Sequence, residues 1–307
     1  MTTDALPSYS KIFHLGHRIL DTILQGCQLV VEEKVDGSQF SFGVRDGKLH
    51  MRSKRIAIHG MDDAPNLFQP TVRHVIAAFE EGLLVEGWTY RGEAFCGPRH
   101  NTLTYERAPL GNLVLFDVDM GIERYAGVVE RAQIAADLGV ECVAVLGVGG
   151  PALASEMSVR AFLANTSQLG GAMVEGVVIK PQDAICGPDA KRLIAKYVSE
   201  AFKETHSKEY IPGTVQKQDV VATIAAHVST PARWMKSVQR LRDEGRLKET
   251  PEDIGPLIKE IQGDVVAESE DEIKEMLWAS YRKQLVGMST RGFPEWYKEQ
   301  LAFGGAR

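Results

Sequence analysis

The sequence contains few cysteines, and they lie far apart. Cys27, Cys96, Cys142 and Cys186 form no C-x-x-C or Cys/His pattern. Structural zinc sites and disulfide frameworks use such close spacing, so neither is predicted. The chain also lacks an apolar run long enough to cross a bilayer, and Met1–Ser10 lacks the basic and apolar regions of a secretory signal. We therefore expect a cytoplasmic protein that binds no membrane.

The chain has no excess of positive charge either. Over 307 residues its formal net charge is −6, which argues mildly against a nucleic-acid binder. Phosphate binding depends on local basic clusters, however, and such clusters lie at Arg52–Arg55, Lys191–Lys208 and Arg233–Arg246. The acidic excess lies largely after residue 248. The overall charge is therefore a poor guide to the partner.

Short apolar and alternating segments fill the first two-thirds of the chain. Leu29–Glu33 is predicted to be a strand, and the alternation in Ser38–Val44 is typical of a half-buried strand. Asp46-Gly47 predicts a hairpin turn into a strand at Leu49–Arg52. Further strands are expected at Leu83–Trp88, Thr89–Phe95, Asn112–Val118, Val174–Lys180 and Leu193–Val198, and helices at Thr71–Glu81, Glu130–Leu138 and Met157–Leu169. This pattern predicts an α+β domain built on antiparallel sheets.

The pattern changes near residue 210. Ile211-Pro212-Gly213 places a proline beside a glycine, a pair that interrupts regular structure. Beyond it, helical periodicity replaces the strand signals. Helices are expected at Val220–Val228, Pro231–Glu244 and Glu270–Tyr281. We therefore predict two domains, a strand-rich one over residues 1–210 and a small helical one over residues 211–307.

A lysine lies between a predicted strand and a glycine-containing turn in Glu33-Lys34-Val35-Asp36-Gly37-Ser38. If Lys34 is buried there, it would lose its proton readily, because desolvation disfavours the ammonium form. A neutral amine is a competent nucleophile. The pattern Lys-x-Asp-Gly also occurs in many plain hairpin turns, so on its own it is a weak signal.

Other polar and aromatic residues follow Lys34, mostly at the ends of predicted strands. They are Arg52, Glu93, Phe116, Glu175, Lys180 and Lys196. Cations hold phosphates, carboxylates hold ribose hydroxyls or a metal ion, and an aromatic ring stacks on a base. Taken singly, Phe116 could equally be an ordinary core residue and not a base platform. Glu175 could equally be an ordinary carboxylate at a strand edge. Together the set indicates a nucleotide site.

The ordered set resembles the covalent nucleotidyltransferase superfamily of DNA ligases, RNA ligases and mRNA capping enzymes, over about residues 29–202. Within it the chain is most similar to the ATP-dependent RNA ligases of the nick-sealing phage type. The features that carry this likeness are Glu33 before the lysine, Arg99-His100-Asn101 before the Phe116 strand, and Phe202-Lys203-Glu204 after the last motif. The resemblance implies an α+β nucleotidyltransferase domain, with ATP-grasp-like antiparallel sheets, followed by a small all-α C-terminal domain.

The resemblance also implies roles on the base and ribose side of a nucleotide. Lys34 would attack the α-phosphate of ATP and carry AMP. Glu33 would help to read the adenine, and Phe116 would stack on it. Glu93 would hold the ribose hydroxyls, and Asp36 would support the site.

On the phosphate side, Lys180 and Lys196 would bind the α-phosphate and stabilise its developing charge. Glu175 would help to place a metal ion, for which Mg²⁺ suits the hard oxygen ligands. Arg52 would contact the sugar or a phosphate, although Arg55 could take this role.

The last motif departs from the family pattern. The superfamily often has Lys-x-Lys there, whereas Ile194 occupies the first position in this chain. Only Lys196 matches, and Lys191 or Arg192 could compensate.

The implied reaction is ATP-dependent sealing of a 3′-hydroxyl and a 5′-phosphate RNA end by a monomer, through lysyl-AMP and an adenylated 5′ end. One alternative is a DNA ligase or a capping-type nucleotidyltransferase of the same superfamily. An alternative of another class is a helix-turn-helix nucleic-acid-binding protein. Its signal is Asp219–Leu247, which has the pattern of a helix-turn-helix followed by a basic helix.

Overall fold

The computed structural model describes residues 6–10, 12–17, 20, 24–54, 56–99, 103–121, 124–183, 193–199 and 220–304. Several residues named above lie outside this part of the chain. They are Arg55, His100, Asn101, Lys191, Arg192, Phe202–Glu204, Lys208, Ile211–Gly213 and Asp219.

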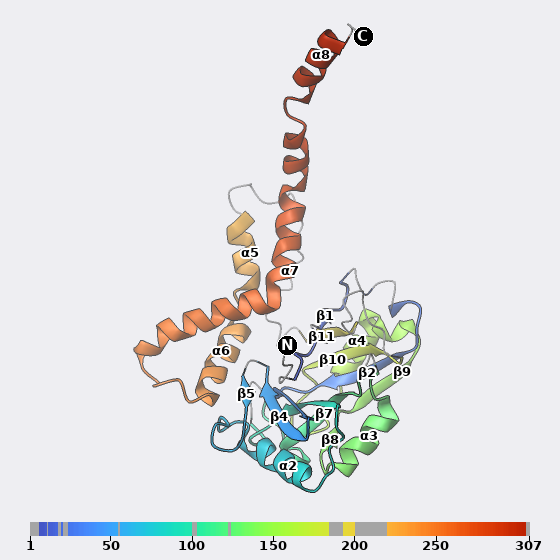
Figure 1. Ribbon diagram of the computed structural model, residues 1–307, viewed down its shortest axis with the longest axis vertical. Helices are drawn as coiled ribbons and strands as arrows, with labels where there is room; N and C mark the ends of the chain where they lie inside the picture. The colour runs from blue at the N-terminus through green and yellow to red at the C-terminus, as the bar shows by residue number, and fades with distance from the viewer. Residues whose placement is uncertain are drawn as a thin grey trace. The chain divides into compact units, whose positions relative to one another are not determined.

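The chain separates into two compact units. The first comprises Met1–Phe202 with Val238–Glu249, and the second comprises Lys203–Ser237 with Thr250–Arg307. All of the described strands belong to the first unit, whereas the second is helical (Figure 1). The α+β class is therefore confirmed, while a domain boundary at residue 210 stays a prediction.

A five-stranded sheet in the first unit carries the Lys34 segment. Its order is β1 (Phe13–His14), β11 (Ala195–Val198), β10 (Gly176–Pro181), β2 (Leu29–Lys34) and β9 (Val145–Gly149). β1 and β11 run parallel, and the other neighbours run antiparallel. Leu29, Val31 and Val177 pack with Val159 of α4 (Glu156–Leu163) into one hydrophobic core. Burial of these branched side chains against a helix fixes which face of β2 points into that core.

A six-stranded sheet forms the other layer of the first unit. Its order is β5 (Ala57–Ile58), β4 (Lys48–Ser53), β3 (Ser38–Arg45), β6 (Thr89–Ala94), β7 (Leu113–Asp119) and β8 (Glu141–Cys142). Only β7 and β8 run parallel. One face packs Phe40, Phe42 and Leu115 against α2 (Gln69–Glu80) and α3 (Val128–Asp137) (Figure 1). The two sheets are therefore mixed, which corrects the prediction of purely antiparallel sheets.

Most predicted elements are confirmed within a few residues, but two in the first unit were wrong. Leu83–Trp88 forms no strand, and its only ladder contact is an isolated bridge from Glu86 to Val44. Leu84 and Trp88 pack against the core, but Leu83, Val85 and Glu86 are exposed, so this stretch lacks the continuous buried face of a strand. The helix expected at Met157–Leu169 ends at Leu163, because a tight turn with two glycines at positive φ follows.

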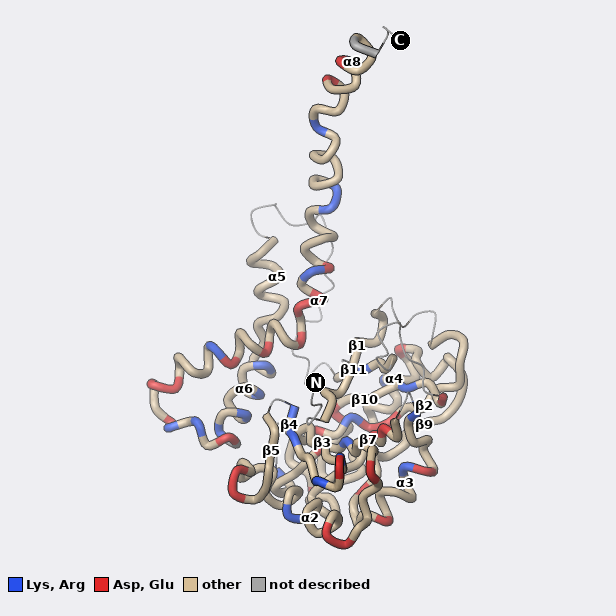
Figure 2. Tube along the Cα trace, in the orientation of Figure 1, with Lys and Arg blue, Asp and Glu red and all other residues tan. Residues whose placement is uncertain are grey.

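The second unit consists of helices packed through small contacts. They are α5 (Val220–Val228), the start of α6 (Pro231–Asp243), whose residues from Val238 onward belong to the first unit, α7 (Ile254–Ser289) and α8 (Phe293–Gly304). Val220 and Ile224 of α5 pack against Met276 of α7. The predicted helix at Glu270–Tyr281 is only part of α7, which continues through Gly263 despite the cost of a glycine in a helix. Lys and Arg outnumber Asp and Glu on α6 (Figure 2).

A buried ion pair stabilises this second unit. The Nε of Arg233 lies 3.2 Å from Oδ2 of Asp264, and both side chains are almost fully buried. Arg233 also donates to the Ser269 hydroxyl and to the carbonyl of Val228, at 2.8 Å each. The start of α6 is thereby fixed to the end of α5 and to α7.

Candidate nucleotide site

Lys34 lies where the chain crosses from one sheet to the other. It is the last residue of β2, and the link Val35–Gly37 leads directly into β3 of the six-stranded sheet. The link passes very close to β6, because a Cβ added to Gly37 would lie 2.7 Å from the Cβ of Glu93. Gly37 is therefore required for a close approach, not for an unusual turn conformation.

The register of the five-stranded sheet brings the predicted phosphate-binding lysines to one face. Lys34 pairs with Gly176 and Lys180 with Val30, while Val178 lies opposite Lys196 on its other side. Directly opposed residues share a face, and residues two apart along a strand do as well. Lys34, Lys180 and Lys196 therefore share one face, as the family resemblance implied.

Glu175 reaches Lys34 from the start of β10. The Nζ of Lys34 donates to both carboxylate oxygens of Glu175, at 2.9 and 2.8 Å. Burial alone would lower the pKa of Lys34, but the negative charges of Glu175, Asp36 and Glu93 raise it overall. The expectation that burial would leave a neutral lysine is therefore wrong for this state. The structure holds the amine as an ammonium ion.

Asp36 is fixed by a loop that sequence reasoning missed. Its Oδ2 accepts from the backbone N–H of Leu103 at 3.1 Å. Its own backbone N–H donates to the hydroxyl of Tyr105 at 2.8 Å. Burial, chiefly, raises the pKa of Tyr105, so the hydroxyl stays protonated beside these carboxylates. Asp36 thus supports the Lys34 segment through backbone contacts.

Glu33 is held by the turn that follows α4. Its side chain is 3% exposed, and Oε2 accepts from the backbone N–H of Gln168 at 2.9 Å. Burial raises the pKa of Glu33, while hydrogen bonds from Ser167 and Gln168 oppose that rise. The backbone N–H of Glu33 also donates to the carbonyl of Ala144. The predicted adenine reader is therefore a rigidly placed carboxylate.

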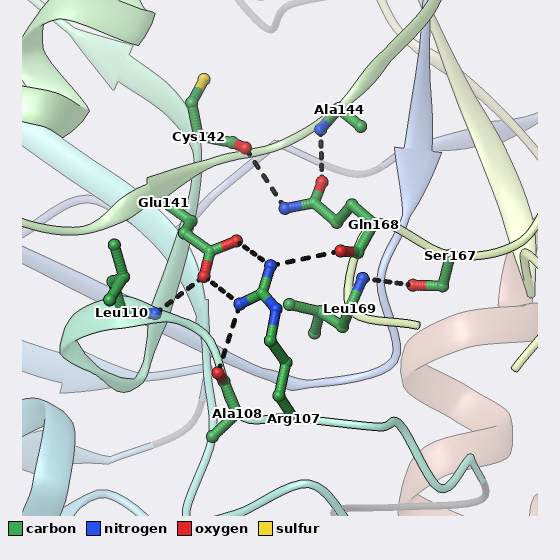
Figure 3. A network of polar contacts seen from close by, with 9 residues as sticks. All are labelled: Arg107, Ala108, Leu110, Glu141, Cys142, Ala144, Ser167, Gln168 and Leu169. Atoms are coloured by element: carbon green, nitrogen blue, oxygen red, sulfur yellow. Dashed lines mark hydrogen bonds and ion pairs between the residues drawn. The ribbon is translucent and has the colours of Figure 1, made fainter. Parts of the chain in front are cut away.

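The same turn is anchored to the surface by a polar network (Figure 3). The amide side chain of Gln168 bonds to the backbone of Cys142, the last residue of β8, and of Ala144, which precedes β9. Arg107 donates to both oxygens of Glu141 and, at 3.2 Å, to the carbonyl of Gln168. The loop that carries Arg107, the turn that carries Gln168 and the strand β8 are thus hydrogen-bonded to one another beside Glu33.

A β-bulge places Phe116 on the side of the six-stranded sheet that carries Glu93. Gly92 pairs with Leu115 and Arg91 with Asp117, so Phe116 is an extra residue in β7. Such a bulge redirects a side chain out of the ladder. The Phe116 ring is half-buried and meets the Tyr9 ring edge-on, with centroids 5.3 Å apart. It remains available as a platform for a base.

Lys180 does not present a free amine. It is 3% exposed, and its Nζ pairs with Glu32 at 2.6 Å and donates to the Phe116 carbonyl at 2.8 Å. Glu32 also pairs with Arg131 of α3, which donates to the same carbonyl. The predicted α-phosphate contact of Lys180 is therefore replaced, in this state, by a buried ion network. Lys196 is half-buried on the same face.

Arg52 is likewise engaged elsewhere. It donates to the backbone carbonyls of Leu6, Ser53 and Lys54, at 2.8, 3.2 and 3.2 Å. The described part of the chain shows no contact between Arg52 and the Lys34 segment. To make its predicted contact with a sugar or a phosphate, Arg52 would have to give up its hydrogen bonds to these carbonyl groups.

Three of the residues that sequence reasoning missed are Glu32, Arg131 and Tyr105. Glu32 had a usable signal, because a residue two positions before Lys34 in a strand lies on the same face. Arg131 and Tyr105 come from a helix and a loop far away in the sequence, and nothing local marks them.

Two properties of the described residues bear on partners. None of the helices in that part of the chain combines the length and apolar character that a membrane crossing needs. In the same described residues, no three His, Cys, Asp or Glu side chains lie close enough together to hold a metal ion. A magnesium ion needs less, since it is usually held by one or two carboxylates and by substrate phosphates.

Comparison with solved structures supports the fold. Naegleria gruberi RNA ligase with PPi is 15% identical with a TM-score of 0.50, covering 66% of this chain and 58% of that chain. A variant of that ligase with AMP and Mn is 14% identical with a TM-score of 0.45, with the same coverage. This chain therefore spans less than two thirds of these relatives. Likeness at this identity shows the fold alone.

No curated protein sequence matches the chain. The family model described as RNA ligase matches residues 28–198, more than half of the chain, and includes Lys34, Glu175 and Lys196. That span contains both sheets except for β1, and every residue of the site described above except Tyr9 and Leu6. The chain therefore belongs to the RNA ligase family.

Proposed function

We propose that this chain is an ATP-dependent RNA ligase that joins a 3′-hydroxyl to a 5′-phosphate RNA end through AMP bound covalently to Lys34. The observation that carries the proposal is the Lys34 amine, held 2.8 Å from Glu175 on the face that also bears Lys180 and Lys196. A nucleophile, an acidic group and cations on one surface suit transfer of a nucleotidyl group.

The two sheets divide the recognition of ATP between them. Glu93 and Phe116 of the six-stranded sheet would hold the ribose and stack on the base. Lys196 of the five-stranded sheet would neutralise the α-phosphate, and Lys180 would join it only on leaving Glu32. The Glu33 carboxylate would accept a hydrogen bond from the adenine amino group. It would repel the carbonyl oxygen that guanine carries at the same position.

The first step requires that Lys34 loses a proton. As an ammonium ion it cannot attack, and Glu175 stabilises that form. Glu175 supplies carboxylate oxygens of the kind that Mg²⁺ binds. When bound, this ion would neutralise phosphate charge. When the contact between Lys34 and Glu175 opens, the carboxylate no longer stabilises the ammonium, and the amine can pass its proton to water. Lys34 then displaces pyrophosphate from the α-phosphorus.

The later steps use the same charges. The AMP passes from Lys34 to the 5′-phosphate of RNA, and a 3′-hydroxyl then displaces AMP. Positioning and charge stabilisation dominate such phosphoryl chemistry. The helical region, proposed as a domain over residues 211–307, would contact the RNA, and α6 carries the basic residues for it. We propose a cytoplasmic monomer.

The first experiment incubates the protein with α-labelled ATP and magnesium, without RNA, and measures label on the denatured protein. We expect label with ATP and little with GTP, and none in Lys34→Arg, which keeps the charge but lacks a nucleophilic amine. Lys48→Arg, on an exposed strand end, is the matched control and should label normally. Equal labelling of Lys34→Arg and the wild type would overturn the proposal.

Sealing assays separate the alternatives within the superfamily. An RNA 3′-hydroxyl strand should be joined faster than a DNA strand if the protein is an RNA ligase. Transfer of a labelled guanylate would instead favour a capping-type enzyme. Binding of one specific duplex sequence, without protein labelling, would favour the helix-turn-helix alternative, in which α5 and α6 are separated only by Ser229 and Thr230.

A further inference from the structure

Two loops hold the residues on either side of Lys34. One loop runs over residues 103–107 and contacts Asp36, and the other is the turn at residues 167–171, which contacts Glu33. Both loops are well separated from the Lys34 segment in sequence. Their contacts fix the backbone on both sides of Lys34, the candidate nucleophile.

The first loop contacts Asp36 twice. Leu103 donates its backbone N–H to the Asp36 carboxylate, and Tyr105 receives the Asp36 backbone N–H at 2.8 Å. Tyr105 is 3% exposed, and its ring meets Phe95 edge-on at 5.9 Å. The hydroxyl is therefore a fixed acceptor, two residues from the reacting amine.

The two loops are also bonded to each other. Glu106 donates its backbone N–H to the carbonyl of Gly170 at 3.2 Å, and Arg107 to that of Leu169 at 3.3 Å. The Arg107 side chain adds a bond to the Gln168 carbonyl (Figure 3). A Cβ at Gly171 would lie 2.9 Å from the backbone nitrogen of Glu106, so the contact is close-packed.

We infer that Tyr105 is a positioning residue for Lys34, and that the Arg107 contact with Gln168 holds the two loops together for the same purpose. The inference rests on the proposed function of Lys34. The Tyr105 hydroxyl fixes the backbone at Asp36, and the opposite loop fixes Glu33, so the Lys34 main chain is held from both sides. In-line attack on a phosphate depends on such placement, and an error of about 1 Å can cost 10²-fold in rate.

Tyr105 acts by position and not as a base. Its pKa is raised, chiefly by burial and further by the carboxylates of Asp36, Glu175 and Glu33. A phenol kept neutral in this way cannot take the proton of Lys34 at neutral pH. Its acceptor lone pair remains engaged by the Asp36 N–H.

The test compares Tyr105→Phe with Tyr90→Phe, each of which removes one hydroxyl. Tyr90 is a matched control, because it is also buried, its pKa is also raised by burial, and its hydroxyl accepts the backbone N–H of Val85 at 2.9 Å. Tyr90 lies in the core on the opposite face of the six-stranded sheet. Loss of general stability should therefore be similar in the two variants.

Single-turnover formation of lysyl-AMP is measured over a range of ATP concentrations. For Tyr105→Phe we expect a maximal rate lowered about tenfold, with half-saturation by ATP changed less than about twofold. Tyr90→Phe should keep the wild-type rate. Sealing of RNA that already carries the 5′ adenylate should be nearly normal in Tyr105→Phe, because that step does not use the Lys34 amine as a nucleophile.

A second pair of variants covers the case in which Tyr105→Phe fails to fold. Arg107→Ala, at a half-exposed side chain, should also slow lysyl-AMP formation, and Arg107→Lys should restore part of the rate. Rates in Tyr105→Phe and Arg107→Ala equal to those of Tyr90→Phe would overturn the inference alone. Absence of label on the wild-type protein would overturn the proposed function, and the inference with it.

Discussion

The Nζ atom of Lys34 lies within 2.9 Å of both carboxylate oxygens of Glu175, so the candidate nucleophile and its acidic neighbour form a closed pair. The pair is only partly shielded from water, since 30% of the lysine side chain is exposed. It nevertheless raises the pKa of Lys34, with help from Asp36 and Glu93. The candidate nucleophile is therefore held in the protonated form in this state.

The pH dependence of the first step should reflect this storage. Because the neutral amine is the reacting form, the rate of lysyl-AMP formation at ATP concentrations well below saturation should rise by about tenfold per pH unit above neutrality. Glu93→Gln removes one of the charges that raise the Lys34 pKa, so the profile should shift to lower pH. A rate that stays flat between about pH 7 and about pH 9 would contradict this assignment.

Gly37→Ala should damage the site more than the fold. The added methyl group would lie 2.7 Å from the Glu93 Cβ and 2.9 Å from the Phe95 ring, so the link after Lys34 must shift. We expect a loss of about 1–3 kcal/mol in the free energy of unfolding and at least about 10²-fold in lysyl-AMP formation. Gly60→Ala, where a methyl group meets no atom within 4 Å, is the control. Similar effects of both changes would be evidence against the close approach.

The buried ion network at Glu32 predicts an order of stabilities. Glu32→Gln leaves Lys180 and Arg131 buried without their shared carboxylate and should cost about 3–5 kcal/mol. Arg131→Met leaves the Glu32–Lys180 pair intact and should cost less. Glu130→Gln, which affects an exposed pair with Arg124, should cost no more than about 1 kcal/mol. Chemical denaturation measures all three, and the reverse order for the two buried sites would refute the account.

Local patterns predicted much of the fold. The strand predicted at Ser38–Val44 is confirmed, although Phe40–Val44 are buried throughout and not on alternate positions. The Asp46-Gly47 turn is confirmed as well, with φ of 52° and 68° at its two residues. The end of α3 at Gly139 is confirmed as well, with a φ of 65°. These features depend on neighbours in sequence, so a pattern is sufficient to find them. The strand predicted at Leu83–Trp88 was wrong because Leu83 and Val85 are exposed and have no core to pack against.

Motif order proposed members of the site but could not predict their pairing. Motif order identified Lys34 and Glu175, which the structure brings into contact across 141 positions of sequence. No local signal could show that Lys180 is neutralised by Glu32, because that pair depends on the register between β2 and β10. Roles of individual cations therefore need the fold, even where the motif is right.

Glu33→Gln should separate stability from nucleotide choice. Folding raises the pKa of Glu33, so the folded state favours the protonated side chain. The free energy of unfolding therefore falls as pH rises through the folded pKa and the side chain becomes a carboxylate. At pH 7 the glutamine variant should therefore be at least as stable as the wild type, with no such gain at acid pH. Its side-chain oxygen can still accept from Gln168. Preference for ATP over GTP should fall by at least about tenfold, measured by protein labelling, and an unchanged preference would remove Glu33 from base reading.

Arg233→Met tests whether the helical region serves RNA and not ATP. It removes the buried pair with Asp264 and the bond to Ser269, so the second unit should lose about 3 kcal/mol or more. Lysyl-AMP formation should persist at nearly the wild-type rate, whereas nick sealing should fall. Parallel loss of both activities would argue that residues 211–307 are not a separate domain.

The crossing at Val35–Gly37 joins two layers that are otherwise built on separate hydrophobic cores. A nucleotide that touches Phe116 on one sheet and Lys196 on the other would add to the contacts that Lys180–Phe116 and Glu32–Arg131 already make between them. Nucleotide binding would then stabilise both layers against unfolding. The gain would be the same for each layer, because the nucleotide is released when either layer unfolds. The covalent adenylate would make those added contacts permanent until RNA removes it.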